Sequence, residues 1–437
     1  MLNRSLPIAL AAAFLAGEAS VDGIAARVTV TVGSDLRWIR PLARRYVRAF
    51  AGKVRPRHRD VVRFLLNDAV FQRYSRKLLV RHWLTEPQHM QPVAAAVGWE
   101  LPAIESVGDL CDRLQLELGE LEWFADLRGL GYRQSDLRLQ HYHYKALAKR
   151  SGDLRLIEAP KQRLKEMQRR ILAEILERIP VHPAVHGFRR GHSIKTFVAP
   201  HVGQPVVLRM DVRDFFPSFQ GPRIQAFFRT AGYPERVADL LGGICTNAVP
   251  RGVWGNSYFD FSPEQLREAR SLYGRSHLPQ GAPTSPALAN LCAYRIDCRL
   301  SGLASSAGAK YTRYADDLAF SGDERFSRDA QRFSEHVAAV LLEEGFSVHH
   351  RKTRIMRSGR RQYLAGLVTN EKVNVVRRDF DLLKAILTNC VRFGAESQNR
   401  EQHPSFRAHL EGRISFVEMI HAEKGARLRG LLGQIQW

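Results

Sequence analysis

The sequence is poor in cysteine, and its cysteines form no recognisable pairs. Five cysteines are scattered along 437 residues, with no CxxC motif and no spacing typical of metal ligands. This pattern argues against a disulfide framework or a zinc module and is typical of a reducing compartment, so we expect a cytoplasmic protein. The sequence also lacks any run of eighteen or more apolar residues, so we expect no membrane-spanning helix and no membrane partner.

The sequence also has far fewer acidic than basic residues. The chain has 44 Asp and Glu against 66 Lys and Arg, which gives a formal net charge of +22. A surplus of this size predicts a polyanionic partner, and nucleic acid is favoured over the alternative, an anionic membrane surface. The composition, with 45% hydrophobic and 25% charged residues, is typical of a folded protein. The length suits two or three packed units.

Residues 1–105 are predicted to form a helical accessory region without chemistry of its own. The apolar residues 6–16 resemble the centre of a short signal peptide, but they are also good helix formers, and we favour a helix. Apolar residues between 61 and 84 recur at three- and four-residue steps, which predicts a second helical segment. The helices of this region could build an oligomer, or its basic residues could hold RNA, among them Arg44, Arg45, Arg48, Arg55 and Arg57.

From residue 106 onward, helical and extended patterns alternate. Ser106 is a predicted N-cap for the first of two short helices. Alternating residues on either side of Gly152 and Asp153 predict a β-hairpin. The expected elements are helices at 106–116, 119–127, 161–179, 380–393 and 412–432, hairpin strands at 141–148 and 151–157, a buried strand at 206–212, and two strands within 310–321.

Three carboxylates stand out among these elements. Asp211 closes the predicted strand 206–212, and Asp316 with Asp317 lies at the tip of the predicted strand pair. Uncompensated carboxylates are costly to bury between apolar strands, whereas carboxylates brought together hold divalent cations through their oxygens. The backbone carbonyl of Val212 is a natural further ligand. Two such ions can activate a hydroxyl and stabilise a leaving pyrophosphate in an in-line displacement.

The segments around these carboxylates resemble the conserved motifs of reverse transcriptases. Residues 211–219 (DVRDFFPSF), 280–286 (QGAPTSP) and 314–317 (YADD) are similar to motifs A, B and C, in that order. The resemblance implies an α+β right-hand polymerase with fingers, an antiparallel-sheet palm and a helical thumb. It assigns the fingers and the start of the palm to 106–210, the palm to 211–370 and the thumb to 371–437. It also implies two Mg²⁺ ions, with Mn²⁺ as a substitute, held by Asp211, Val212, Asp316 and Asp317.

The resemblance further implies residues that bind the incoming nucleotide. Residues 155–160 (RLIEAP) and the helix after them are similar to the fingers of bacterial reverse transcriptases, where Arg155 and Lys165 would clamp the triphosphate. Phe216 would lie under the sugar and exclude a 2′-hydroxyl, because an aromatic wall offers that group no hydrogen bond. Gln280 and Gly281 would contact the nucleotide and the template.

Template and primer binding are expected from basic residues that contact the phosphate backbone. Residues 186–193 (HGFRRGHS) resemble the loop before motif A in retron and group II intron enzymes. Arg189 and Arg190 in that loop, and Lys352 and Arg354 after the catalytic hairpin, are the candidates.

Among these enzymes, retron reverse transcriptases are the nearest likeness. The resemblance implies an RNA-directed DNA polymerase that copies a structured noncoding RNA from dNTPs, in antiphage defence and with a separately encoded effector protein. Two retron features are incomplete: His201 and Gly366 are present, but the Asn-Ala and Val-Thr pairs expected beside them are absent. Two alternatives stay open, a template-independent or protein-primed polymerase of the abortive-infection type, and an RNA-binding scaffold with a vestigial site.

Overall fold

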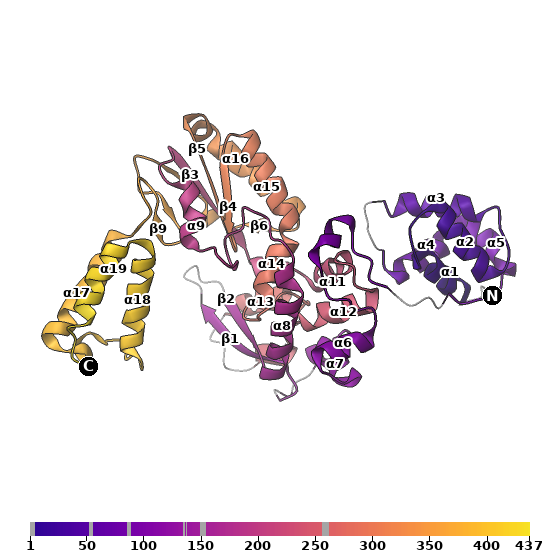
Figure 1. Ribbon diagram of the computed structural model, residues 1–437, viewed down its shortest axis with the longest axis horizontal. Helices are drawn as coiled ribbons and strands as arrows, with labels where there is room; N and C mark the ends of the chain where they lie inside the picture. Colours follow the sequence, from indigo (N-terminus) through magenta and orange to yellow (C-terminus); the bar gives the residue numbers. More distant parts are fainter. Residues whose placement is uncertain are drawn as a thin grey trace. The chain divides into compact units, whose positions relative to one another are not determined.

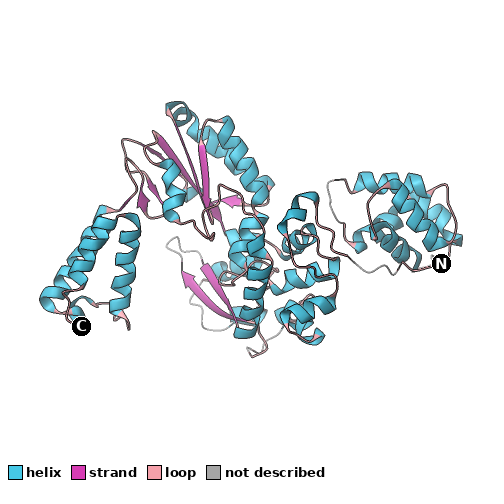
Figure 2. Ribbon diagram, viewed as in Figure 1, coloured by secondary structure: helices cyan, strands magenta, loops and turns pink. Residues whose placement is uncertain are grey.

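The computed structural model describes residues 5–51, 56–84, 89–133, 136, 138–148, 154–255 and 262–437. The chain divides into two compact units, unit 1 with Met1–Ile179 and Phe219–Ser285 and unit 2 with Pro180–Ser218 and Pro286–Trp437. Both units combine helices with strands, as Figures 1 and 2 show, so the predicted mixture of helix and sheet is confirmed. The boundaries at 105, 210 and 370, and the division into fingers, palm and thumb, stay predictions.

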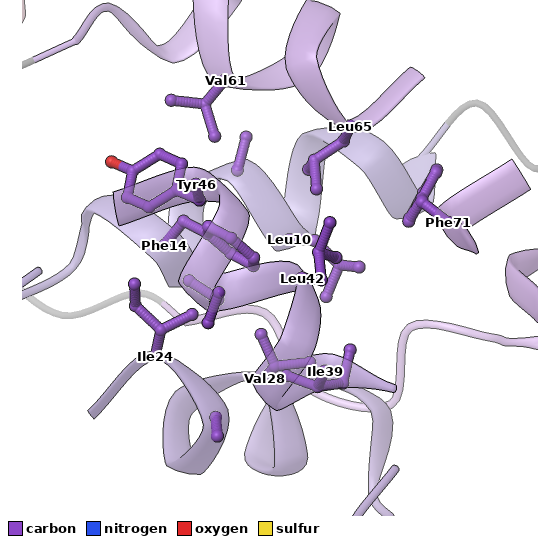
Figure 3. Packing of buried hydrophobic residues seen from close by; sticks show 14 of the residues in the cluster. Leu10, Phe14, Ile24, Val28, Ile39, Leu42, Tyr46, Val61, Leu65 and Phe71 are labelled. Atoms are coloured by element: carbon purple, nitrogen blue, oxygen red, sulfur yellow. The ribbon is translucent and has the colours of Figure 1, made fainter. Parts of the chain in front are cut away.

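The N-terminal part of unit 1 is a helical bundle with a continuous apolar core. Figure 3 shows Phe14, Leu42 and Tyr46 among the side chains that meet there. The first helix has no charged residue, and a helix that is apolar all round is stable only when buried. The predicted helix at 6–16 is therefore confirmed as a core element. The bundle consists of α1 (Ser5–Leu15), α2 (Val21–Val32), α3 (Ile39–Ala49), α4 (His58–Asn67) and α5 (Ala69–Tyr74).

The predicted helical segment 61–84 is partly wrong. Helix ends at Tyr74, a single 3₁₀ turn follows to Lys77, and the chain beyond it is extended. Leu78, Val80 and Leu84 all pack on the bundle core, and a two-residue spacing suits an extended chain that lays one face on a surface. Over a run as short as 78–84, the spacing of apolar residues fits both a helix and an extended chain, so the pattern alone could not distinguish them.

The rest of unit 1 contains a hairpin and six described helices. Ser106 caps α6 through a capping box, as predicted. Strand β1 (Tyr142–Ala148) pairs antiparallel with β2 (Leu154–Pro160), which confirms the hairpin strands, while the predicted turn at Gly152 and Asp153 lies outside the described residues. The helices are α6 (Val107–Leu114), α7 (Leu118–Ala125), α8 (Gln162–Glu174), α11 (Gly221–Thr230), α12 (Glu235–Ile244) and α13 (Pro263–Tyr273).

Helix α8 stops five residues before the predicted end at Ile179. A 3₁₀ turn, Leu176–Arg178, replaces its last turn, and Ile179 is extended. The ring of a proline disfavours helical backbone at the residue before it, so Pro180 accounts for the extended Ile179.

Unit 2 is organised around an antiparallel sheet with strand order β4-β5-β3-β6, in which β7 also pairs with β3. The central strand β3 (Val206–Arg213) begins with three fully buried aliphatic residues. The other strands are β4 (Lys310–Tyr314), β5 (Asp317–Gly322), β6 (Ser347–Val348) and β7 (Arg354–Arg357). Helix α16 (Glu324–Glu343) packs on β3 and β5, and α15 (Tyr294–Ser306) packs on β4. The shorter helices are α9 (Ile194–Val198), α10 (Phe215–Ser218) and α14 (Ser285–Cys292).

The C-terminal part of unit 2 joins a small sheet to three helices. Strands β8 (Tyr363–Leu364), β9 (Leu367–Val368) and β10 (Asn374–Val375) form an antiparallel sheet in the order β10-β9-β8. Helices α17 (Arg377–Phe393), α18 (Phe406–Ile420) and α19 (Ala422–Leu432) are labelled in Figure 1, and buried apolar residues from all three belong to one core. The predicted helix at 412–432 is two helices, because His421 between them is extended. No helix in the described ranges has the length and hydropathy that crossing a membrane requires.

Candidate active site

The sheet of unit 2 brings the three predicted carboxylates together. Asp211 on β3 lies opposite Asp317, the first residue of β5, in the antiparallel register. The amide of Val212 donates a hydrogen bond of 2.9 Å to the carbonyl of Asp316. Ala315 adopts a positive φ of 54°, which lets the chain reverse within two residues and keeps both aspartates at the end of the sheet. The three side chains therefore meet at one turn.

Burial and mutual repulsion disfavour the charge of this group. Burial, followed by the charges of Asp211 and Asp317, raises the pKa of Asp316 to about 6. Burial also raises the pKa of Asp317, although the guanidinium of Arg209 opposes the shift. A shared proton or a cation would relieve both effects.

Two basic side chains form ion pairs with the carboxylates of Asp211 and Asp317. Lys352 Nζ lies 2.9 and 3.0 Å from the two carboxylate oxygens of Asp211. Arg209 donates from Nε and Nη2 to Oδ1 of Asp317, at 2.9 and 2.7 Å. Within the described residues, no group of three or more His, Cys, Asp or Glu side chains is arranged as it stands to hold a metal ion. The carboxylates of Asp211 and Asp317 are thus paired with cationic side chains.

The donors nevertheless suit a divalent cation. Carboxylate and carbonyl oxygens are the ligands that Mg²⁺ takes in proteins, and Asp211, Asp316 and Asp317 supply them at one turn. Burial and the charges of Asp211 and Asp317 raise the pKa of Asp316, and a bound cation would oppose all of these causes. Val212 lies beside Asp211 at the same end of β3, where its carbonyl stays a predicted ligand.

A buried guanidinium supports the turn that carries Asp316 and Asp317. Arg313 has 1% exposure and forms a two-pronged ion pair with Asp297, at 2.7 Å for both contacts. Its Nη1 donates to the carbonyl of Ala315 at 3.2 Å and to Oδ1 of Asn290 at 3.1 Å. The positively charged group therefore fixes the backbone of the turn directly before Asp316.

The residues predicted to bind the nucleotide belong to both units. Phe216 is half-buried on α10 of unit 2. In unit 1, Arg155 is exposed on β2 and Lys165 is half-buried on α8. Gln280 and Gly281 follow α13, and the Gln280 carbonyl accepts a 2.9 Å hydrogen bond from the amide of Glu158.

Gly281 has a conformation that requires glycine. Its φ is 133°, and a Cβ placed on it would lie 2.9 Å from the carbonyl oxygen of Glu158. Glu158 is itself fixed, because its buried carboxylate lies 2.8 Å from Nε2 of buried His277. Burial opposes a charge on His277, but the Glu158 carboxylate outweighs it and raises the pKa of the imidazole. A buried ion pair thus holds the loop at Gln280.

The predicted nucleic-acid contacts differ in their surroundings. Arg190 and Arg354 are exposed and Arg189 is half-buried, as backbone-contacting residues can be. Lys352, which we placed in the same group, instead lies on the carboxylate of Asp211. Its role in template binding stays a prediction.

His201, one of the retained retron features, is a core residue. Its ring nitrogens lie 2.7 Å from the hydroxyls of Ser321 and Thr312, on β5 and β4. Burial lowers the pKa of the imidazole to about 3, so the ring is neutral at physiological pH. The side chain therefore ties the segment before β3 to strands β4 and β5.

Sequence reasoning missed the charged partners of the site. Arg209 stands two positions before Asp211, and residues at that spacing share one face of a strand, so alternation alone was enough to find it. Asp297 and Arg313 gave no comparable signal, because sixteen residues and a helix separate them. The partnership of Glu158 with His277 joins even more distant segments.

Comparison with known proteins identifies the family. Residues 147–375 match the family described as reverse transcriptase (RNA-dependent DNA polymerase). Two relatives come from Myxococcus xanthus. The retron Mx65 reverse transcriptase is 37% identical, covering 87% of this chain and 78% of that protein, and the retron Mx162 reverse transcriptase is 36% identical, covering 79% and 69%. The retron Ec86 reverse transcriptase of Escherichia coli is 28% identical, covering 65% and 77%.

Among solved structures, the similarity is weaker. Telomerase from Candida albicans, solved with a fragment of telomeric RNA, aligns over 67% of this chain and 59% of that chain at 11% identity. Its TM-score of 0.35 is too low to carry an argument about the fold. The family match spans the three carboxylates, and the sequence identity extends well beyond it. The chain therefore belongs to the retron-type reverse transcriptases and is an RNA-directed DNA polymerase.

Proposed function

We propose that this polymerase copies a structured noncoding RNA into DNA by adding deoxynucleotides to a primer 3′-hydroxyl through two-metal phosphoryl transfer. The observation that carries the proposal is the meeting of Asp211, Asp316 and Asp317 at one turn of the sheet. Bringing a buried carboxylate and two half-buried ones together is costly for stability, and the cost is understandable where they hold cations for catalysis.

Polymerases of this family depend on divalent metal ions, and we propose Mg²⁺, with Mn²⁺ as a substitute. Bound to these oxygens, two such ions would activate the 3′-hydroxyl and neutralise charge on the leaving pyrophosphate. Without metal, the side chains of Lys352 and Arg209 supply the positive charge beside the carboxylates of Asp211 and Asp317. We propose that Lys352 turns toward nucleic-acid phosphate once Asp211 has another cation.

The nucleotide-binding residues are proposed with the roles that the family resemblance implies. Arg155 and Lys165 neutralise the triphosphate, which suits an exposed guanidinium and a half-buried ammonium group. Gln280 and Gly281 contact the base pair, and support comes from the rigid loop that Glu158 and His277 hold. Phe216 limits the space at the sugar, so deoxynucleotides are preferred over ribonucleotides.

For the RNA we propose contacts at Arg189, Arg190 and Arg354 and a further surface on the N-terminal bundle. Helix α3 exposes Arg40, Arg44 and Arg48, which are four residues apart and therefore lie along one side of the helix. The apolar side of α3 is buried in the bundle core, so it has no apolar face to insert into a membrane. This favours RNA over the membrane and over an oligomer.

The test of catalysis is a primer-extension assay on an RNA template with dNTPs and Mg²⁺. Asp316→Asn and Asp317→Asn should each abolish incorporation, while Asp381→Asn, which changes an exposed carboxylate on α17, should leave it intact. Activity that survives in both aspartate variants would exclude the assigned site. An inactive wild type that still binds RNA would favour the scaffold instead.

The identity of the RNA is tested by sequencing the nucleic acid that copurifies with the protein expressed with its native flanking DNA. One DNA species copied from a single small RNA would support the proposal, whereas homopolymeric or protein-linked DNA would favour the abortive-infection alternative. The role in antiphage defence rests on the retron resemblance alone, as does the separate effector. Phage plating on cells with the wild type or the Asp316→Asn variant tests it: equal plating would contradict a defence role that needs polymerisation.

A further inference from the structure

The loop before β3 holds an aromatic residue in an unusual state. Phe188 has a positive φ of 56° and its side chain is 51% exposed. A bulky residue with left-handed backbone costs stability, and an exposed ring recovers little of that cost through burial. Strain of this kind persists where the surrounding structure enforces it, and it clusters at functional sites. The position therefore calls for an explanation other than packing.

The surrounding structure does enforce it. Residues on both sides of Val185 pair with the strand that leads to the catalytic turn: the amide of Arg313 donates to the carbonyl of Ala184, and the amide of His186 donates to the carbonyl of Arg313, both at 2.8 Å. Val185 forms a parallel bridge with Arg313. The loop thus follows β4 towards Ala315.

The backbone at Gly187, directly before Phe188, packs closely on the turn at Ala315. A Cβ on this glycine would lie 2.7 Å from the amide nitrogen of Ala315, so only glycine permits so close an approach. Asn290 Nδ2 donates a buried 2.9 Å hydrogen bond to the Gly187 carbonyl, and the same side chain accepts from Arg313. The backbone that presents Phe188 is therefore tied to the network that supports the catalytic turn.

The ring of Phe188 lies against two residues of the site. Its centroid is 6.2 Å from that of Phe216 and 6.2 Å from that of Tyr314, the residue that begins the YADD turn. Both partners are half-buried. The Phe216 ring contacts two other rings. Phe215 is buried in the interior, whereas Phe188 is exposed and contacts Phe216 from the solvent side.

We propose that Phe188 is a positioning residue that holds the ring of Phe216 at the sugar of the incoming nucleotide and so sets the preference for deoxynucleotides. The inference rests on the proposed role of Phe216 and gives a role in sugar selection to a residue of the loop 186–193, for which the resemblance implied only nucleic-acid contacts by Arg189 and Arg190. Phe216 belongs to a helix of only four residues, α10, which by itself limits the ring weakly. With Phe188 removed, the Phe216 ring gains rotational freedom, and a 2′-hydroxyl finds space that the paired rings deny it.

The experiment compares dGTP with GTP on a poly(rC) template with an oligo(dG) primer, using the full chain. The readout is the ratio of kcat/KM for the two nucleotides. Phe188→Ala should lower the ratio about three- to tenfold, as the loss of one aromatic contact allows, while Phe188→Tyr keeps the ring and should keep the ratio. Tyr294→Ala, which removes a half-exposed ring of unit 2 on α15, is the matched control and should leave the ratio unchanged.

Phe188→Gly guards against a variant that fails to fold. It removes the ring but suits a φ of 56°, so thermal unfolding should show equal or higher stability while the ratio falls as for alanine. A purely structural role would instead change stability and leave the ratio alone, which would overturn the inference.

Phe216→Ala separates this inference from the proposed function. If it leaves the ratio unchanged, the assigned role of Phe216 is wrong. If Phe216→Ala lowers the ratio and Phe188→Ala does not, only the inference about Phe188 is wrong. If both lower it, the double variant should show no further loss, because Phe188 acts through Phe216; additive losses would mean that Phe188 acts independently and would also overturn the inference.

Discussion

Asp297 is the buried counterion of Arg313, which supports the turn that carries Asp316 and Asp317. Its carboxylate accepts hydrogen bonds from Arg313 and from the hydroxyl of Tyr311, and both ionic side chains are at most 1% exposed. Asp297→Asn keeps the size of the side chain but removes the charge. The guanidinium cannot respond by losing its proton, because its pKa stays above the physiological range. It is left as a buried positive charge without a counterion.

The expected loss follows from what such a charge costs. Removing one partner of a buried ion pair typically destabilises a protein by about 3–5 kcal/mol. For a unit of this size that corresponds to a fall in Tm of about 6–20 °C, which calorimetry of the full chain measures directly. Asp381→Asn is the control, because it breaks an exposed pair with Arg377 and should change stability by about 0.5 kcal/mol or less.

A double variant separates stability from catalysis. Asp297→Leu with Arg313→Met removes both charges and fills the space with apolar atoms, so stability should recover much of the loss. Activity should not recover, because the donor to the Ala315 carbonyl is gone and the catalytic turn is no longer held. The reasoning is refuted if Asp297→Asn lowers Tm no more than the Asp381 control, or if the double variant is fully active.

Charged groups elsewhere give three further tests. Burial and nearby carboxylates raise the pKa of Asp316 to about 6, so the metal-free protein should lose stability as the pH rises from about 4 to about 6. Asp316→Asn should regain up to about 3 kcal/mol of unfolding free energy at pH 7.5, measured by unfolding in the presence of EDTA. The raised pKa of His277 means that its pair with Glu158 stabilises unit 1 fully below about pH 6.5 and less as pH rises through that raised value, a dependence that Glu158→Gln should flatten. Arg44→Glu with Arg48→Glu should weaken RNA binding and reduce the slope of log Kd against log salt by about 2, and an unchanged slope would contradict the bundle surface.

The elements that carry the carboxylates were predictable because their signals are local. An apolar run ending in Asp211 and a tight turn before Asp317 both express the geometry of a strand that is buried and then reverses. The N-cap at Ser106 is equally local, since it needs only one hydroxyl and the amide three residues later. Where an element is set by contacts between residues close in sequence, the prediction and the structure agree.

What sequence could not reveal depends on contacts between distant segments. The resemblance marks the loop 186–193 but not the role of Phe188, because the conformation of that residue is imposed by Asn290 and by the close approach of Gly187 to the turn. The same holds for Lys352, whose position on Asp211 arises only once the segment after α16 returns to the edge of β3. Such residues look like ordinary surface aromatics or cations until the sheet is assembled.

The surplus of positive charge has two uses that the composition could not distinguish. Arg209, Lys352 and Arg313 serve within the protein, compensating Asp317, Asp211 and the charge of Asp297 around one turn. Exposed arginines such as Arg44 and Arg48 on α3 remain available to a polyanion. Removing an internal cation should therefore change the stability and metal affinity of the site with little effect on the salt dependence of RNA binding, whereas removing an α3 arginine should do the reverse. Arg209→Met against Arg44→Met makes this comparison at equal loss of charge, and a similar change in salt dependence for both would show that the charge acts as a whole.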